Sequence, residues 1–196
     1  MDIKTLYPIL YRFTNQDGKY PQLSGILYED GYLTASSAFV LAHVHYEDYD
    51  FDYEGMSIDK ENRIVNQKFP NFKHLLDITG MDELRDDYVV KVKYCLHNIP
   101  TGSRDENDFV ILTVEGFNLH SFELSLAFEL FESLGELPSM HFGMSLRPVV
   151  MQSQSCTVVI RPEIKNLKPN DLLFTVEQAV KINLPRLLFN DYKAQK

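Results

Sequence analysis

Short apolar runs joined by tight turns dominate this sequence, and they restrict the fold more than any other feature. The runs LSGILYE and YLTAS, at 23–29 and 32–36, are separated by Asp30-Gly31. Glycine tolerates a positive φ, so this dipeptide is typical of a β-hairpin turn. Similar runs predict strands at 37–46, 47–54, 56–59, 63–67, 88–99, 109–117, 139–146, 148–153 and 156–163. Because hairpins then outnumber strand–helix–strand crossovers, we expect an α+β fold with antiparallel sheets.

Helical periodicity predicts two main helices, over residues 2–13 and 120–134. Apolar side chains recur at steps of three and four residues in the first and at steps of four in the second, and Gly135 is a natural stop for the second. The apolar stripes are Ile3, Leu6, Leu10 and Phe13, and then Phe122, Leu126, Leu130 and Leu134. Shorter helices are predicted at 71–77 and 81–87, and a further helix at 171–184.

Composition limits what the chain can bind. Its 19 basic residues against 28 acidic ones leave a net charge of −9. This charge argues against a general nucleic-acid coat protein, although a basic stripe on an acidic body is still compatible with it. The sequence shows no signal peptide and no apolar stretch near the roughly 20 residues that cross a bilayer. Cys95 and Cys156 lie apart in apolar runs, which predicts buried free thiols, and we expect a cytoplasmic protein with no membrane partner.

The motifs with catalytic or metal-binding potential are weak. His43, His45 and Glu47 alternate on one strand face, and such a pair of histidines can bind zinc, but an ordinary polar strand face explains the pattern as well. The carboxylate pairs carry no acid–base signature, the serines lack a nucleophile elbow, and no glycine-rich phosphate loop is present. We therefore expect a protein that is not an enzyme and uses no metal and no cofactor.

The segment EDYDFDYE at 47–54 alternates carboxylates with aromatic rings. A strand there would place the rings on one face and the acids on the other. Tyrosine is favoured at interfaces, so Tyr49, Phe51 and Tyr53 form a candidate protein-binding surface. The alternative is a solvated edge strand that its charges protect from aggregation.

Three stretches in a fixed order resemble another protein family. They are LSGILYEDGYLTASSAFVLAHVHY at 23–46, KFPNF at 68–72 and RPVVMQSQSCTVVIRPE at 147–163. They resemble the hairpin opening, the Phe-Pro-Asp-Tyr segment and the closing hairpin of a bacterial DNA sliding-clamp domain. Ser37 stands where the family usually has Asp, and Arg161 stands where a Met commonly precedes the Pro.

The resemblance implies a clamp-like domain over residues 1–165 and a helical C-terminal extension over 166–196. It also implies helices that present cations to the backbone of double-stranded DNA, with Lys4, Arg12 and Lys19 as the candidate DNA-binding residues, and a possible homo-oligomer. The second main helix departs from this pattern because it has no Lys or Arg. It carries the carboxylates of Glu123, Glu129 and Glu132 instead.

Two functional hypotheses follow. The first is a non-enzymatic, sliding-clamp-like binding or scaffold protein linked to DNA replication, with DNA and replication proteins as partners. The alternative is an acidic protein-interaction module that keeps the clamp-like fold but does not bind DNA.

Overall fold

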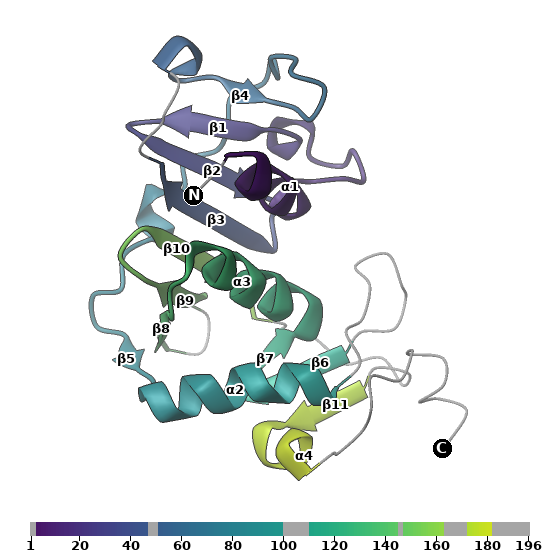
Figure 1. Cartoon of the computed structure of the whole chain (residues 1–196), viewed down its shortest axis with the longest axis vertical. Helices are drawn as coiled ribbons and strands as arrows, with labels where there is room; N and C mark the ends of the chain where they lie inside the picture. The colour runs from purple at the N-terminus through teal and green to yellow at the C-terminus, as the bar shows by residue number, and fades with distance from the viewer. Residues whose placement is uncertain (1–2, 47–50, 100–109, 145–146, 163–171, 182–196) are drawn as a thin grey trace.

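The computed structural model describes residues 3–46, 51–99, 110–144, 147–162 and 172–181 (Figure 1). The helices are α1 (Ile3–Phe13), α2 (Asp86–Asn98), α3 (Ser121–Leu134) and α4 (Val176–Lys181), with 3₁₀ turns η1 (Pro21–Leu23), η2 (Phe51–Tyr53) and η3 (Lys73–Leu75). The strands are β1 (Ile26–Glu29), β2 (Tyr32–Ser36), β3 (Val40–His45), β4 (Ser57–Ile58), β5 (Asp82–Glu83), β6 (Val110–Val114), β7 (Phe117–His120), β8 (Ser139–Phe142), β9 (Val149–Gln152), β10 (Cys156–Ile160) and β11 (Leu172–Thr175).

The strands form two sheets, so the predicted α+β class with antiparallel sheets is confirmed. The larger sheet has the order β4-β1-β2-β3-β10-β9-β8-β5, and all its neighbouring strands are antiparallel. Its two halves join where β3 pairs with β10, with Ala42 opposite Val158. The smaller sheet has the order β11-β6-β7, and β11 runs parallel to β6. Helices α1 and α3 lie side by side over the larger sheet, while α2 packs against α3 and α4 (Figure 1).

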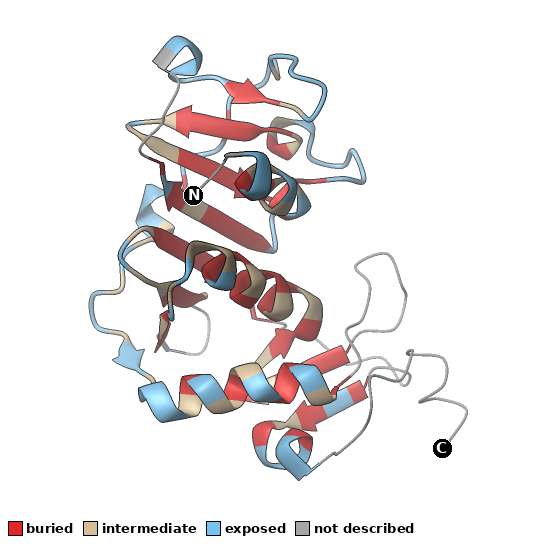
Figure 2. Ribbon diagram, in the orientation of Figure 1, coloured by how far each residue is buried: buried red, intermediate tan, exposed pale blue. Residues whose placement is uncertain are grey.

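The larger sheet is buried on both faces along its central strands (Figure 2). Side chains alternate along a strand, so Val158 and Ile160 of β10 join the main core beneath the helices. Val159, between them, joins a smaller apolar cluster on the opposite face. That cluster consists of Leu23, Leu27, Leu41, Phe69, Phe72, Val150 and Val159. The segment that covers this outer face is therefore residues 69–81, whose partly buried apolar side chains pack against it.

Helices α1 and α3 confirm the predictions for 2–13 and 120–134. Gly135 ends α3 in the left-handed conformation, with φ of 73°. Both cysteines are buried and free, as predicted. Burial raises the pKa of the Cys95 thiol to about 11, so this thiol carries almost no thiolate at neutral pH.

The strand predicted at 88–99 is wrong, because residues 88–98 lie in α2. The run of β-branched residues from Val89 to Val92 suggested a strand. The buried side chains, however, recur with helical spacing, and packing against α3 and α4 selects the helix over the local β preference. The buried positions are Val89, Val92, Cys95 and Leu96.

Several shorter predictions also need correction. The run at 109–117 is two strands rather than one, because Glu115 and Gly116 adopt positive φ and turn β6 into β7. The helix predicted at 81–87 contains β5 instead, and the helix predicted at 171–184 begins only with α4, after β11. In the acidic segment 47–54, residues 51–53 form a 3₁₀ turn rather than a strand, and residues 47–50 lie outside the described residues.

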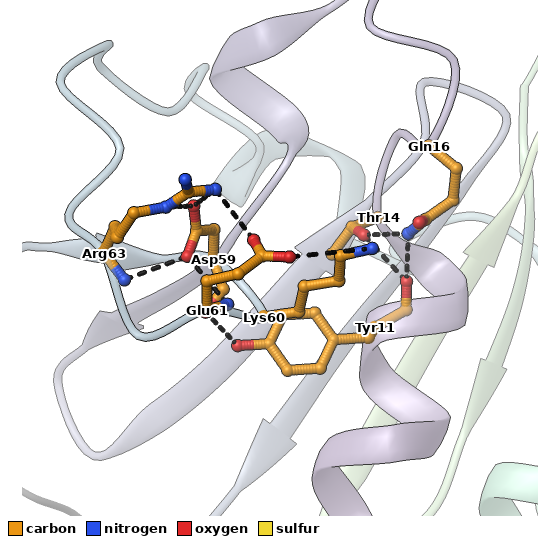
Figure 3. Close-up of polar contacts among 7 residues, drawn as sticks. All are labelled: Tyr11, Thr14, Gln16, Asp59, Lys60, Glu61 and Arg63. Carbon is orange, nitrogen blue, oxygen red and sulfur yellow. Dashed lines mark hydrogen bonds and ion pairs between the residues drawn. The ribbon is translucent and has the colours of Figure 1, made fainter.

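The end of α1 is tied to the turn that follows β4 (Figure 3). The Tyr11 hydroxyl donates a hydrogen bond of 2.7 Å to the carbonyl oxygen of Asp59. The Asp59 carboxylate in turn accepts hydrogen bonds from the backbone N–H groups of Glu61 and Arg63 and from the Arg63 guanidinium. These contacts fix the sheet edge at β4 relative to the helix that covers the sheet.

The division of the chain at residue 165 stays a prediction. Residues 172–181 form β11 and α4, which pack against β6 and α2. This described part of the segment 166–196 is therefore integrated into the smaller sheet.

We predict that Leu10→Ala lowers the free energy of unfolding by about 2–5 kcal/mol, because Leu10 is fully buried and its truncation leaves a cavity under α1. Chemical denaturation measures the change. Thr5→Ala, at an exposed position of the same helix, serves as the control and should change stability by less than about 0.5 kcal/mol. Equal losses in the two variants would show that α1 does not pack as described.

Candidate protein-binding groove

A groove of about 400 Å³ opens on the outer face of the larger sheet, the face turned away from α1 and α3. Such a volume is typical of ligand sites, which are concave and mostly apolar. The lining comprises Leu23, Ser36, Ala38, Phe39, Val40, Leu41, Phe69, Pro70, Asn71, Phe72, Leu75, Pro148, Val159, Arg161 and Pro162. We call this site the outer groove.

The turn between β2 and β3 builds one wall of the outer groove. The Ser36 hydroxyl accepts a hydrogen bond from the Ala38 N–H at 3.2 Å and donates one to the Val40 carbonyl at 3.1 Å. Ala38 adopts φ of 74°, a conformation that this small turn requires. The Phe39 side chain is left 41% exposed at the mouth of the groove, although it is large and apolar.

The second wall is an aromatic cluster that continues into the sheet. The rings of Phe69 and Phe72 meet edge to face at 5.8 Å. Phe72 lies 5.4 Å from the ring of His43, which stacks on Tyr32 at 4.2 Å. Aromatic contacts of this kind add to the stability gained by burial, so the wall is held rigidly.

The third wall comes from the ends of β9 and β10. Pro148 lies just before β9, and Arg161 and Pro162 follow β10. The Arg161 N–H donates a hydrogen bond of 2.8 Å to the Phe39 carbonyl, which extends the pairing of β10 with β3. This bond fixes Arg161 and Phe39 beside each other at the mouth.

The histidine pair does not form a metal site with the residues that are described. His43 and His45 both contact the Tyr32 ring, and a hydrogen bond of 2.8 Å joins the His43 Nδ1 to the Thr34 hydroxyl. The third residue of the pattern, Glu47, lies outside the described residues. Within the described ranges no group of three or more His, Cys, Asp or Glu side chains is arranged to hold a metal ion.

The predicted DNA-binding residues are located on α1 and in the loop after it. Lys4 is exposed on α1, and the Arg12 guanidinium pairs with the Glu129 carboxylate at 2.5 Å. Lys19 pairs with the neighbouring Asp17 at 3.0 Å. A second cross-helix pair joins Lys93 of α2 to Glu132 of α3 at 2.7 Å. The exposed carboxylates of α3 are thus balanced by cations from the helices on either side.

The predicted aromatic surface is only partly described. Tyr49 lies outside the described residues, and Phe51 begins the turn η2. Tyr53 is 38% exposed, and its ring packs 5.5 Å from that of Tyr28, a residue of the main core. Tyr53 therefore contributes to packing as well as to the surface.

The sequence motifs did not identify the outer groove. No lining residue belongs to a catalytic or metal-binding pattern, and the sequence around Phe39 is typical of an ordinary strand. The family resemblance was the one feature of the sequence that could have pointed to the groove. The stretches that carry it supply every lining residue except Leu75, and they are 23–46, 68–72 and 147–163.

Comparison with solved structures identifies the fold. The chain superposes on the sliding clamp of Bartonella birtlesii bound to griselimycin with a TM-score of 0.55 and 13% identity, over 83% of this chain and 64% of the clamp chain. It superposes on the Bacillus subtilis clamp with a TM-score of 0.53 and 14% identity, over 83% and 63% of the two chains. A Caulobacter crescentus clamp with bound polyethylene glycol gives a TM-score of 0.58 and 11% identity, over 82% and 64%.

The fold is therefore that of the bacterial sliding clamps, the beta subunits of DNA polymerase III, as the resemblance indicated. The chain spans less than two thirds of the length of these clamp chains. No family model matches the sequence, and no curated relative matches it. Among the described helices, none is long and apolar enough to cross a membrane.

We predict that the protein loses stability as the pH falls from about 6.5 to about 4. Burial lowers the pKa of His43 to about 4, and the Lys73 charge adds to this effect while Asp30 opposes it. The unfolded chain therefore takes up a proton near pH 6.5 that the native chain does not accept until about pH 4. The loss from this group should be about 1–2 kcal/mol, given the partial exposure of the ring.

Urea unfolding at a series of pH values tests this expectation. His43→Phe should flatten the pH dependence over that interval, whatever its effect on stability at pH 7. Val90→Ser, which removes an exposed side chain that does not titrate, should keep the wild-type slope. An unchanged slope in His43→Phe would contradict the assignment.

Proposed function

We propose that this chain is a non-enzymatic, cytoplasmic scaffold that acts in DNA replication by binding partner proteins in the outer groove. The proposal rests on where three stretches of the sequence lie in the folded chain. The three stretches that resemble sliding clamps lie far apart in the sequence, and they converge on one groove. The fold shared with the clamps supports the replication setting.

The chemistry of the outer groove favours binding over catalysis. Arg161 is the only ionisable side chain among its described lining residues, so the groove offers no nucleophile with an adjacent base. The remaining walls are apolar or aromatic, apart from Ser36 and Asn71. A site of this kind stabilises a complex by burying apolar side chains, and a short apolar peptide segment is the partner that fits it best.

We predict that peptides selected from a random display library against the whole chain bind the groove through large apolar side chains. Phe39→Ser should weaken their binding at least about tenfold, because it removes an exposed ring from the mouth. Fluorescence anisotropy measures the affinity. Val90→Ser, which removes a side chain that is 51% exposed on α2, should leave it unchanged.

The same experiment separates this proposal from the acidic surface at 47–54. If Tyr53→Ser rather than Phe39→Ser abolished peptide binding while the protein stayed folded, the aromatic residues Tyr49, Phe51 and Tyr53 would be the docking surface. The outer groove would then be excluded as the protein-binding site.

DNA association through Lys4, Arg12 and Lys19 is a second candidate function. The observation that favours it is the pairing of the α3 carboxylates Glu129 and Glu132 with Arg12 and Lys93, because balanced carboxylates repel phosphate less than isolated ones. The same pairing also occupies Arg12, so the expected affinity for duplex DNA is low and falls steeply with salt.

We predict that light scattering with a duplex oligonucleotide shows a gain in mass at low salt and none at moderate salt. Glu129→Gln should strengthen DNA binding by about threefold, because it releases the Arg12 guanidinium for phosphate. Glu61→Gln, at a carboxylate paired with Arg63 in the turn after β4, serves as the control. A mass that DNA does not change at low salt would leave a protein-interaction module that keeps only the clamp-like fold.

A further inference from the structure

The edge of the larger sheet at β1 and β4 lies beyond the main contacts of α1, which are with β2 and β3 (Figure 1). Four tyrosine rings extend from α1 to this edge in a continuous chain of contacts. They are Tyr7, Tyr11, Tyr28 and Tyr53, and we call them the tyrosine row. Tyr28 belongs to the main core, and Tyr7 and Tyr11 pack against it, so the row lies on the face opposite the outer groove.

The tyrosine row is anchored near both of its ends. The distances between successive ring centroids are 5.8, 6.3 and 5.5 Å, and each pair of rings is tilted. Tyr11 is held by its hydroxyl, which donates a hydrogen bond to the carbonyl oxygen of Asp59. Near the other end, the Gly55 N–H donates a hydrogen bond of 2.8 Å to the Tyr28 carbonyl oxygen, which ties the chain after η2 to β1. A partner that binds the row therefore has few side chains to order.

Part of the tyrosine row is open to solvent. The Tyr53 side chain is 38% exposed, and Met56 is 37% exposed. The Met56 N–H donates a hydrogen bond of 2.9 Å to the Tyr53 carbonyl oxygen, so the two residues share one turn. Tyr7 and Tyr11 are half-buried. Aromatic surface of this kind is favoured in protein interfaces, and the face of a tyrosine ring attracts a cation.

Carboxylates gather at the Tyr53 end of the tyrosine row. The sequence EDYDFDYE at 47–54 contains five carboxylates and no cation. Among its described members, Asp52 and Glu54 directly flank Tyr53 in the chain, and both are exposed. At the other end of the row, two ion pairs balance the charges of the turn at 59–63 (Figure 3). A cationic partner therefore meets carboxylates together with exposed ring surface at the Tyr53 end.

We propose that the tyrosine row binds an arginine-bearing segment of a partner protein, with an Arg side chain stacked on the Tyr53 ring and paired with the carboxylates of Asp52 and Glu54. Arginine fits this surface better than lysine, because its planar guanidinium stacks on aromatic rings and forms two parallel hydrogen bonds with a carboxylate. The row and the outer groove lie on opposite faces of the larger sheet. The row is therefore a second docking surface that is independent of the proposed function.

Three synthetic peptides test the proposal on the full chain. The first is a dye-labelled Gly-Arg-Leu-Arg-Gly with both ends blocked. The second carries citrulline, a neutral side chain of similar shape, in place of each Arg, and the third carries Lys in the same positions. By fluorescence anisotropy at low salt, the Arg peptide should bind at least about tenfold more tightly than the citrulline peptide and at least about threefold more tightly than the Lys peptide.

Substitution of Tyr53 separates the ring from its bulk. Tyr53→Leu keeps an apolar side chain against Tyr28 but removes the aromatic face, so it should weaken the Arg peptide about fivefold and bring it within about twofold of the Lys peptide. Tyr53→Phe keeps the ring and should retain the preference for Arg. Tyr94→Leu, at a tyrosine that is 53% exposed on α2, is the matched control and should change nothing.

A charge-matched pair of double variants tests the carboxylates. Asp52→Asn with Glu54→Gln should weaken the Arg peptide at least about fivefold, because it removes the negative charge beside the ring. Asp82→Asn with Glu83→Gln changes the net charge equally, at β5 on the opposite edge of the same sheet, and should leave binding within about twofold of wild type.

Three results would overturn the proposal. If the Arg and Lys peptides bind equally well and Tyr53→Leu weakens neither, a net charge of −9 attracts any cationic peptide and the row is not a site. If Phe39→Ser weakens the Arg peptide and Tyr53→Leu does not, the segment binds in the outer groove. If light scattering shows a dimer that Tyr53→Leu dissociates, a second copy of this chain covers the row.

Discussion

Val158, Val159 and Ile160 follow one another along β10, and their alternating side chains supply two separate apolar clusters. Burial on both faces is what allows the central strands to carry consecutive apolar residues, because neither face has to be compatible with water. The helices cover one face and residues 69–81 cover the other. The position of the outer groove depends on this second cover, since the groove lies where residues 69–75 meet the β2–β3 turn and the ends of β9 and β10.

The helices on the other face of the larger sheet are connected to one another by ion pairs. Arg12 of α1 and Lys93 of α2 each reach a carboxylate of α3, so Glu129 and Glu132 are paired with cations of the neighbouring helices. Exposed ion pairs of this kind stabilise a fold only slightly. Their main effect here is to leave a nearly balanced surface where a strongly basic one would be expected of a protein dedicated to holding phosphate.

Local sequence patterns were sufficient to predict many of the helices and strands of the fold. The Asp30-Gly31 hairpin, the helices α1 and α3 and the strands β8 to β10 all follow from turn chemistry and apolar spacing. The failures occur where tertiary packing overrides local preference. Val89, Val90 and Val92 favour a strand by themselves, and only the contacts of α2 with α3 and α4 make the helix more stable.

The candidate site was harder to predict because nothing local defines it. Phe39, Phe72 and Arg161 lie in three separate parts of the sequence, and each is unremarkable until β3 pairs with β10. The same holds for the cations of α1, because a sequence does not show that Glu129 approaches Arg12 from another helix. The stretches that carry the family resemblance supply nearly all of the lining, but only the folded structure shows that they meet in one groove.

The parallel pairing of β11 with β6 has a consequence for how the protein reaches its native state. Val110 pairs with Leu172, and the intervening chain forms β7, α3 and the hairpin of β9 and β10. During synthesis, the smaller sheet therefore exists only as a two-stranded hairpin until residues 172–175 leave the ribosome. Such hairpins are marginally stable alone, and α2 lacks the α4 contacts at Cys95 and Asn98 during that time. The larger sheet can assemble first, and the nascent chain is then open to aggregation or chaperone binding mainly at the unpaired edge of β6.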